Sequence, residues 1–223
     1  MCGRFTLTTS PEQLRAVFEG FSVPDQIQPR YNIAPTQPIA VVPNDGKNQV
    51  DFFHWGLMPS WAKEPTISSR MINARAETLA ERPAYRAAYR RRRCLVLADG
   101  FYEWRQEPGG RTKTPMYIKL QSGQPFAFAG LWENWQSPNG SNIFSCAIIT
   151  TEPNSLMQTI HNRMPVILPG TAYSQWLEPR EVDPGNLQEL LIPYPAGQMD
   201  AFPVSTLVNS PVNDNPRCIQ PVT

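Results

Sequence analysis

The sequence predicts a single-domain α+β protein in which antiparallel β-sheets curl towards a barrel and a few helices flank them. Proline accounts for 24 of the 223 residues and is spread along the chain, which argues against a helical bundle because proline breaks helix interiors. Hydrophobic residues make up 41% of the chain, with ten Phe, seven Tyr and six Trp, a composition that excludes a disordered protein. Short runs rich in β-branched and aromatic residues alternate with turn sequences.

The predicted strands are short runs of β-branched and aromatic residues, each followed by a turn signal built from Gly, Pro, Asn or Asp. Such a spacing is typical of strands joined by tight connections rather than by helices. The chain contains neither an internal repeat nor a low-complexity linker, so we expect one domain over residues 1–223. The predicted strands are 39–42, 50–55, 94–98, 116–120, 126–131 and 144–150.

The clearest helix begins after Ser10. Ser10 is a suitable N-cap, Pro11 occupies the first helical position, Gln13 lies in the first turn, and Gly20 is expected to end the helix. Further helical stretches are predicted at 75–89 and 171–177, with a weaker one at 186–191.

The charge distribution excludes some classes of protein and favours others. A net charge of +1 excludes a generally basic nucleic-acid coat and a polybasic membrane anchor. Arginine nevertheless outnumbers lysine sixteen to four, and half of the arginines lie between residues 70 and 93. Arginine grips phosphate and carboxylate groups bidentately, so the sequence predicts a local anion-binding patch. Arg82, Arg86 and 90–93 form a separate basic stretch, typical of a solvated helix end, of which we assign only part to DNA.

The four cysteines are too far apart in sequence for the common zinc motifs. We therefore expect no metal, and the absence of a glycine-rich phosphate loop predicts no nucleotide cofactor. Neither an apolar run long enough to span a bilayer nor a signal-peptide pattern is present, so the sequence predicts a cytoplasmic protein with reduced thiols and no membrane partner. Cys94, Cys146 and Cys218 are expected to be buried, inert thiols.

Cys2 can have a reactivity that internal cysteines lack, because it follows the initiator methionine. Removal of Met1 would leave a free α-amine beside the thiol, which together form a 1,2-aminothiol. An α-amine has a pKa of about 7.7–8.0, so part of it is neutral at pH 7 and can add to an aldehyde. The thiol can then close onto the imine carbon to give a thiazolidine. The thiol alone could instead attack an acyl carbon, as in cysteine hydrolases, and a cysteine at position 2 can also be incidental.

Six segments in a fixed order identify a resemblance that covers essentially the whole chain. Together they strongly resemble the SRAP family, the SOS-response-associated peptidase-like proteins that sense abasic sites in DNA, and the match continues to 203–205 and 220–222. The segments are 1–5 (MCGRF), 30–36 (RYNIAPT), 53–61 (FHWGLMPSW), 72–78 (INARAET), 98–104 (ADGFYEW) and 161–165 (HNRMP).

The resemblance implies a covalent function in the response to DNA damage. Family members bind single-stranded DNA and react with the ring-opened aldehyde of an abasic site. The product is a thiazolidine DNA–protein crosslink through the processed N-terminal cysteine, matched here by Cys2, and the family removes its own Met1 autocatalytically. We therefore expect a protein that acts as a monomer on abasic single-stranded DNA without a cofactor and joins the nucleoid when bound.

The resemblance also assigns roles to other residues. Glu103 is expected to be an acid/base, because a carboxylate is unusual in an aromatic, strand-like segment, and the other interpretation is a structural carboxylate that satisfies Arg75 or a backbone amide. His161 is expected to act on the abasic sugar, and Asn73 and Asn32 to hydrogen-bond the reacting group or hold the N-terminus. The predicted DNA-binding residues are Arg4, Asn32, Pro35, Trp61, Arg75 and Arg163.

Two other functions remain open on the sequence alone. A thiol peptidase would use Cys2 as nucleophile, His161 as base and Glu103 to orient the base. A non-catalytic single-stranded DNA-binding module would make Cys2 incidental. A peptidase needs only the thiol, whereas thiazolidine formation needs both the thiol and the α-amine.

Overall fold

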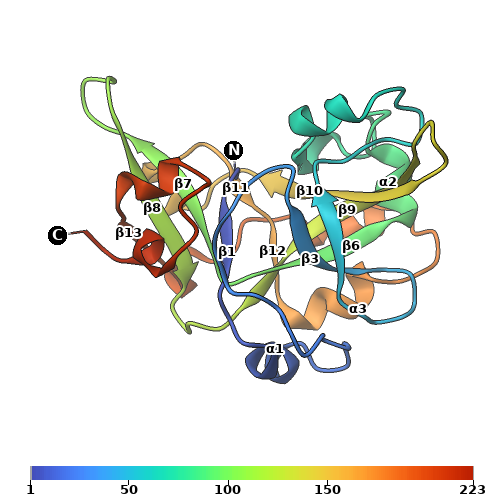
Figure 1. Ribbon diagram of the computed structural model, residues 1–223, viewed down its shortest axis with the longest axis horizontal. Coiled ribbons are helices and arrows are strands. Elements are labelled where there is room, and N and C mark those ends of the chain that lie inside the picture. Colours follow the sequence, from blue (N-terminus) through green and yellow to red (C-terminus); the bar gives the residue numbers. More distant parts are fainter. Residues whose placement is uncertain (1, 223) are drawn as a thin grey trace.

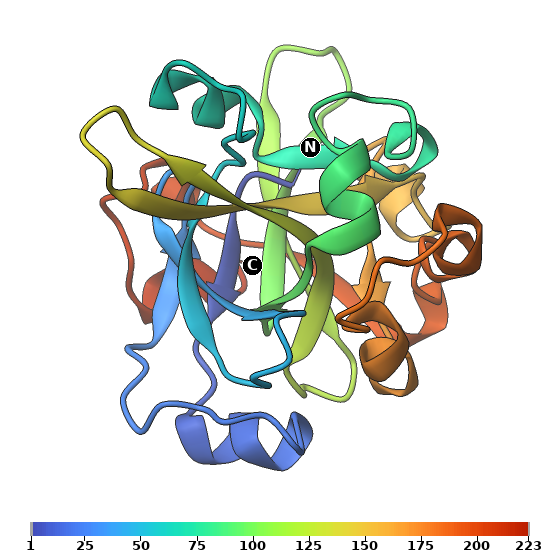
Figure 2. The same ribbon diagram turned by 90° about the vertical axis from the view of Figure 1, so that its right-hand side faces the viewer.

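The computed structural model describes residues 2–222 and contains a closed β-barrel beside a second sheet (Figures 1 and 2). Five strands close the barrel in the order β10–β4–β3–β6–β9, with β9 pairing back onto β10. Four of these pairings are antiparallel, and the β10–β4 pairing is parallel. The barrel strands are β3 (Pro38–Pro43), β4 (Asp51–Trp55), β6 (Arg93–Ala98), β9 (Phe126–Gln136) and β10 (Asn142–Thr151).

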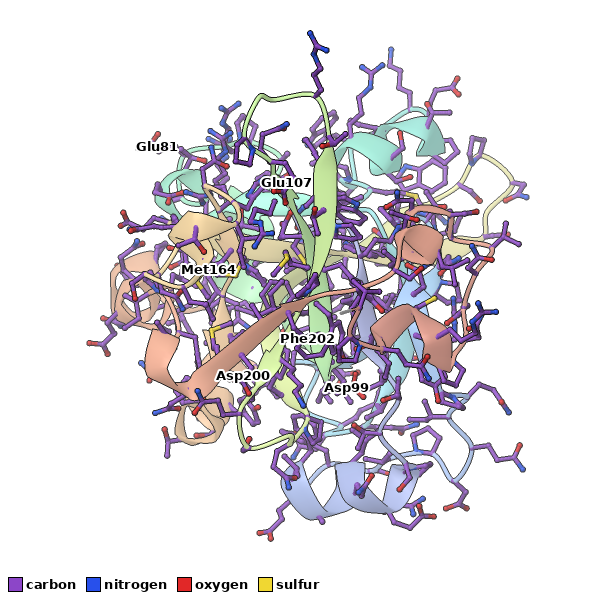
Figure 3. The ribbon with its side chains drawn as sticks, turned by 90° about the vertical axis from the view of Figure 1, so that its left-hand side faces the viewer. Glu81, Asp99, Glu107, Met164, Asp200 and Phe202 are labelled. Carbon is purple, nitrogen blue, oxygen red and sulfur yellow. The ribbon has the colours of Figure 1, made fainter. Side chains whose placement is uncertain are left out.

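The second sheet is wholly antiparallel and has the strand order β13–β8–β7–β1–β2. In Figure 1 its strands β13, β8 and β7 form the left part of the molecule, and its strand β1 lies near the centre, on the side of the barrel. Asp99 and Glu107, labelled in Figure 3, mark the two ends of β7. The strands are β1 (Phe5–Leu7), β2 (Arg30–Ile33), β7 (Gly100–Gln106), β8 (Lys113–Leu120) and β13 (Met199–Pro203).

Three short strands attach further segments to the barrel. β5 pairs in parallel with β10, while β11 and β12 pair antiparallel with β10 and β9. The fold is therefore the predicted α+β arrangement of curled, mainly antiparallel sheets with a few helices. The bounds of these strands are Asn73–Arg75 for β5, Met164–Pro165 for β11 and Ile167–Leu168 for β12.

The helices are short, as the high proline content predicts. Ser10 caps α1 (Pro11–Val17) in a capping box with Gln13, which confirms the predicted start, although the helix ends before Gly20. Predicted helix 171–177 is present as a 3₁₀ turn followed by α3 (Tyr173–Trp176). None of the helices within residues 2–222 is long and apolar enough to cross a bilayer. The 3₁₀ helices are Pro65–Arg70, Ala76–Thr78, Met157–Thr159, Gly170–Ala172, Pro184–Leu190, Ala196–Gln198, Thr206–Asn209 and Pro216–Ile219.

The predicted helix over 75–89 is wrong for most of its length. Residues 73–75 form β5, a 3₁₀ turn follows, and the helix α2 occupies only Arg86–Arg91. Pro83 interrupts the stretch that the pattern treats as continuous, and proline removes a helical hydrogen bond. Pairing with β10 gives the backbone of residues 73–75 hydrogen-bond partners, which the first residues of a helix lack for their amide groups. Tertiary pairing therefore overrides the local helix propensity.

One hydrophobic core joins the two sheets through β1. The ring of Phe5 packs edge-on against Trp55 of β4 at 5.1 Å and against Phe128 of β9 at 5.8 Å, measured between ring centroids. Asp99 then fixes the chain that leaves β1, since its carboxylate accepts hydrogen bonds from Thr6, Thr8 and Thr9. These contacts determine where the N-terminal residues run.

Arg93 corrects the expectation that the basic stretch 90–93 is a solvated helix end. Its side chain is completely buried, at the start of β6, and burial lowers the pKa of its guanidinium. Within residues 2–222 the guanidinium hydrogen-bonds to no carboxylate, and it donates instead to backbone carbonyls of α2 and of segment 176–180. These acceptors are the carbonyl oxygens of Tyr89, Arg90, Trp176, Glu178 and Arg180.

Replacing Arg93 should therefore unfold the protein more readily. We expect Arg93→Leu to lower the free energy of unfolding by about 3 kcal/mol or more, because several buried carbonyls lose their donor at once. The control is Arg180→Leu, whose side chain is 89% exposed and whose loss should cost less than about 0.5 kcal/mol. Urea denaturation measures both, and equal values for the two variants would contradict the structural role of Arg93.

Candidate active site

The pairing of β1 with β7 brings the N-terminal residues alongside Glu103. Phe5 lies opposite Phe101, and the amide of Tyr102 donates to the carbonyl of Arg4 at 3.0 Å. Continuing this antiparallel register places Gly3 beside Glu103, with Cys2 one residue further on. The closeness is also electrostatic, because the charge of Glu103 contributes to the raised pKa of the Cys2 thiol.

Cys2 is a buried thiol. Its residue has no exposed surface, and burial raises the pKa of the thiol well above its usual range, with Glu103 adding to the effect. The side-chain amide of Asn73 donates to the Cys2 carbonyl at 2.8 Å and so fixes the backbone of this residue. A protonated thiol in this position is a poor direct nucleophile at neutral pH.

Glu103 is a buried carboxyl group on β7. Its side chain is only 2% exposed, and burial raises its pKa to about 7. A carboxyl group with such a pKa can donate or accept a proton at physiological pH, which ordinary glutamates cannot do efficiently. The structure places the Glu103 carboxyl group near the His161 imidazole.

His161 faces Glu103 from the segment that precedes β11. Its Nε2 lies 3.9 Å from Glu103 Oε2, which is too long for a direct hydrogen bond. Nδ1 lies 3.1 Å from the amide nitrogen of Arg163, which donates to it when the ring proton is on Nε2. Burial lowers the pKa of the imidazole, which favours a neutral ring. A neutral imidazole beside a proton-carrying carboxyl group is suited to proton transfer.

Asn73 and Thr150 supply polar atoms at the junction of β5 and β10. Asn73 lies opposite Ile148, and Thr150 lies opposite Arg75, in the parallel pairing. Within residues 2–222, neither the Oδ1 atom of Asn73 nor the Oγ1 atom of Thr150 has a hydrogen-bond partner, although both atoms are buried. Buried polar atoms normally have partners, so these two are candidates to bind a reacting group. No local sequence signal marks Thr150, which sequence reasoning missed.

Asn32 and Arg4 contact each other, and both contact the C-terminal segment. Asn32 is fully buried on β2 and donates to the carbonyls of Val208, Ser210 and Asn213. The structure therefore gives Asn32 a structural role in place of the predicted DNA contact, since its side chain has no surface to offer. Arg4 is half-buried and donates to Asn32 Oδ1 at 2.8 Å and to the carbonyl of Val208, so its predicted contact with phosphate stays a prediction.

The remaining predicted DNA-binding residues differ in their exposure. Trp61 is 59% exposed, in the loop that follows β4, and Arg75 is exposed at the end of β5. Pro35 is half-exposed and precedes Thr36, whose φ of 72° is unusual for a residue other than glycine. Arg163 is held by Glu77 in an ion pair. Glu77 belongs to the sequence motif at 72–78, but no local sequence signal indicates its pairing with Arg163.

The geometry defines a class of site. A buried N-terminal thiol, a carboxyl group with a pKa near neutrality and a neutral imidazole meet where the barrel and the second sheet join. Among residues 2–222, no group of three or more His, Cys, Asp or Glu side chains, these three included, is arranged so that it could hold a metal ion. The site is therefore suited to covalent chemistry with proton transfer.

Comparisons with known proteins place this site in a family. The family model described as SOS response associated peptidase (SRAP) matches residues 1–211. The abasic site processing protein YoqW of Bacillus subtilis is 48% identical over 224 residues, covering 99% of both chains. The abasic site processing protein HMCES of Xenopus tropicalis is 32% identical, covering 98% of this chain and 78% of its own. A crystal structure of a Bacteroides thetaiotaomicron protein covers all of both chains with 26% identity and a TM-score of 0.88.

The chain belongs to the SOS response associated peptidase family. This confirms the resemblance identified from the six sequence segments, and the solved structure confirms the fold.

The raised pKa of Glu103 should appear in the pH dependence of stability. Because burial holds this pKa at about 7, against about 4.3 in an unfolded chain, wild type loses stability as pH rises from about 4 to 7. We expect Glu103→Gln to remove this loss, so that the variant gains on the order of 2–3 kcal/mol relative to wild type between pH 4 and pH 8.

Denaturant unfolding at the two pH values measures this difference. The control is Glu81→Gln, which changes an exposed carboxylate, labelled in Figure 3, and should behave as wild type at both pH values. A stability difference between Glu103→Gln and wild type that does not change with pH would show that Glu103 titrates normally.

Proposed function

We propose that this protein processes abasic sites in single-stranded DNA by forming a covalent thiazolidine crosslink through Cys2. The observation that carries the proposal is the meeting of the Cys2 residue, the Glu103 carboxyl group and the His161 imidazole at one buried site. The names of the relatives support it, since YoqW and HMCES are called abasic site processing proteins.

The first step requires the α-amine of Cys2. Removal of Met1, a residue outside those described, frees this amine, and its nitrogen attacks the aldehyde carbon of the ring-opened sugar. The resulting carbinolamine loses its hydroxyl group as water and becomes an imine. Glu103 is suited to supply the proton for that water, because its pKa of about 7 keeps a large fraction protonated at neutral pH.

The second step uses the thiol of Cys2. The sulfur adds to the imine carbon, a carbon–sulfur bond forms, and the thiol proton passes to the nitrogen. The overall reaction joins the protein to the aldehyde with the loss of one water molecule and needs no oxidant or cofactor. Because burial keeps the thiol protonated, attack by the amine first and closure by the thiol second is the favoured order.

Two other side chains are placed to assist. Asn73 fixes the Cys2 carbonyl through its amide nitrogen, which leaves its Oδ1 atom to accept a hydrogen bond from the α-amine. His161 is positioned to donate a proton from Nε2 to the sugar oxygen as the deoxyribose ring opens, since Nδ1 accepts from the Arg163 amide and the neutral ring then carries its proton on Nε2.

Single-stranded DNA is the substrate that the surface fits best. Arg75 is exposed at the end of β5, two residues after Asn73, and can contact a phosphate, while Trp61 offers an exposed aromatic face on which a base can stack. A duplex would keep the abasic sugar away from a buried residue such as Cys2. Pro35, half-exposed beside a constrained Thr36, is a second surface for a flanking base.

A thiol peptidase acting on other proteins is less well supported. Such an enzyme needs a thiol whose pKa is lowered by a neighbouring cation, whereas burial and Glu103 raise the pKa of Cys2. The imidazole of His161 faces Glu103, which leaves the carboxyl group beside Cys2 as the acid/base.

Denaturing electrophoresis with a single-stranded oligonucleotide carrying one abasic site tests the proposed function. We expect the Met-processed protein to give a heat-stable shifted band, and an intact strand to give none. Cys2→Ala should abolish the band, and Cys2→Ser should as well, because a hydroxyl group closes onto an imine far less readily than a thiol. A heat-stable band from Cys2→Ala would contradict the mechanism.

The role of Glu103 has its own test in the rate of adduct formation. We expect Glu103→Gln to slow the reaction about 10²-fold at pH 6, because an amide cannot supply the proton for loss of water. The ratio of the wild-type rate to the variant rate should fall as pH rises through about 7, since Glu103 loses its proton there.

Glu107→Gln is the matched control for this measurement. Glu107 follows β7 and is labelled in Figure 3, and its carboxylate pairs with Arg105, away from Cys2. This variant should react at the wild-type rate across the pH range. A ratio of rates that stays constant with pH for Glu103→Gln would show that Glu103 does not act as the acid.

A further inference from the structure

Arg163 is held in a bidentate ion pair. Its Nη1 donates to Glu77 Oε1 at 2.6 Å and its Nη2 donates to Glu77 Oε2 at 2.9 Å. Nη2 also donates to the carbonyl oxygen of Thr150 at 2.7 Å. The guanidinium therefore presents to Glu77 the same two-pronged face with which arginine grips a phosphate group.

Few donors of Arg163 remain for DNA. A guanidinium has five N–H groups, and three of them make the hydrogen bonds to Glu77 and Thr150. The Nε atom is buried and has no hydrogen-bond partner within residues 2–222. Only one N–H group, on Nη1, is then left to meet a ligand. A full grip on a phosphate thus requires the carboxylate of Glu77 to leave.

Glu77 covers this cation on the solvent side. The side chain of Glu77 is 49% exposed, whereas that of Arg163 is 16% exposed. The hydrogen bonds from Arg163 lower the pKa of the Glu77 carboxyl group, which keeps it ionised at neutral pH. A phosphate that approaches Arg163 consequently meets a negative charge first, and like charges at this distance repel.

In the Glu77–Arg163 ion pair, Glu77 can move while Arg163 stays in place. Arg163 keeps its bond to the Thr150 carbonyl when Glu77 leaves, so the guanidinium retains its place on β10. Its backbone amide also donates to His161 Nδ1, which ties the same residue to the site. Glu77, in a 3₁₀ turn of three residues, has an exposed carboxylate that can turn into water, and partly exposed ion pairs are weak.

We propose that Glu77 is an intramolecular substitute for a DNA phosphate, which occupies Arg163 in the free protein and is displaced by the backbone of a single strand entering the site. The proposal rests on the proposed function and names Glu77 as a residue that sets DNA affinity. Only molecules in which the Glu77–Arg163 pair is open can bind the phosphate fully. The apparent association constant for DNA therefore equals the intrinsic constant multiplied by the fraction of molecules with an open pair. Intact strands are then released readily, while abasic strands are retained by the covalent bond.

Binding of an intact, fluorescently labelled single strand of about 15 nucleotides, followed by anisotropy, tests the proposal. An intact strand carries no aldehyde, so binding is measured without the covalent step. We expect Glu77→Gln to bind three- to tenfold more tightly than wild type at low salt, because the amide keeps the shape and loses the charge. The log–log dependence of affinity on salt should steepen by about 0.7, the value for one additional neutralised phosphate on a single strand.

Three variants separate this effect from simple loss of negative charge or of structure. Glu81→Gln removes the same charge four residues away and should change affinity less than twofold. Glu77→Asp keeps the charge and should not bind more tightly than wild type. In an Arg163→Ala background, Glu77→Gln should tighten binding no more than Glu81→Gln does, because no cation is left to release.

The outcomes of the experiment are distinct. The proposal is overturned if Glu77→Gln binds DNA only as tightly as Glu81→Gln does, or more weakly than wild type. Weaker binding would show that Glu77 positions Arg163 for DNA. The wild-type adduct with abasic DNA is measured in parallel. A wild-type adduct together with unchanged binding by Glu77→Gln refutes only the phosphate substitute, whereas absence of both DNA binding and an adduct in wild type refutes the proposed function as well.

Discussion

The antiparallel pairing of β1 with β7 is the constraint on which the site depends. β1 has only three residues, yet its position is fixed by the Phe5 ring, which packs against the barrel, and by the Asp99 carboxylate, which accepts hydrogen bonds from the threonines that follow. The residues before Phe5 must then run along β7 towards Glu103. The second sheet supplies the Glu103 carboxyl group from β7, and the barrel supplies Asn73 through β5.

Burial shifts the pKa values of Cys2, Glu103 and His161 so that all three groups favour the same charge state. It raises the pKa of Cys2 and of Glu103 and lowers the pKa of His161, so each group favours its neutral form. A site with little fixed charge stabilises proton transfer more than it stabilises a thiolate. This electrostatic character fits imine chemistry better than acyl transfer by a cysteine nucleophile, and it is a consequence of the fold rather than of any single neighbour.

Much of the fold and part of the site could be predicted from the sequence. The six predicted strands are present because runs of β-branched and aromatic residues with turn signals depend on local chemistry, and the capping box at Ser10 is equally local. The helix predicted at 75–89 is largely absent, since pairing with β10 decides the structure of its first residues, and local propensity does not reveal that pairing. Burial of Arg93 and Asn32 and the Glu77–Arg163 pair likewise depend on contacts between distant segments, which composition and spacing do not encode.

Mass spectrometry of the crosslinked protein after digestion tests the central claim most directly. Trypsin cleaves after Arg4, so the account predicts that the sugar remnant is found on the tripeptide Cys2–Gly3–Arg4, with Met1 absent and the mass lower by one water than the sum of the parts. The thiol of this peptide should resist alkylation because its sulfur is in the thiazolidine ring. A remnant on another residue, on a peptide that retains Met1, or on a Cys2 whose thiol still alkylates would contradict it.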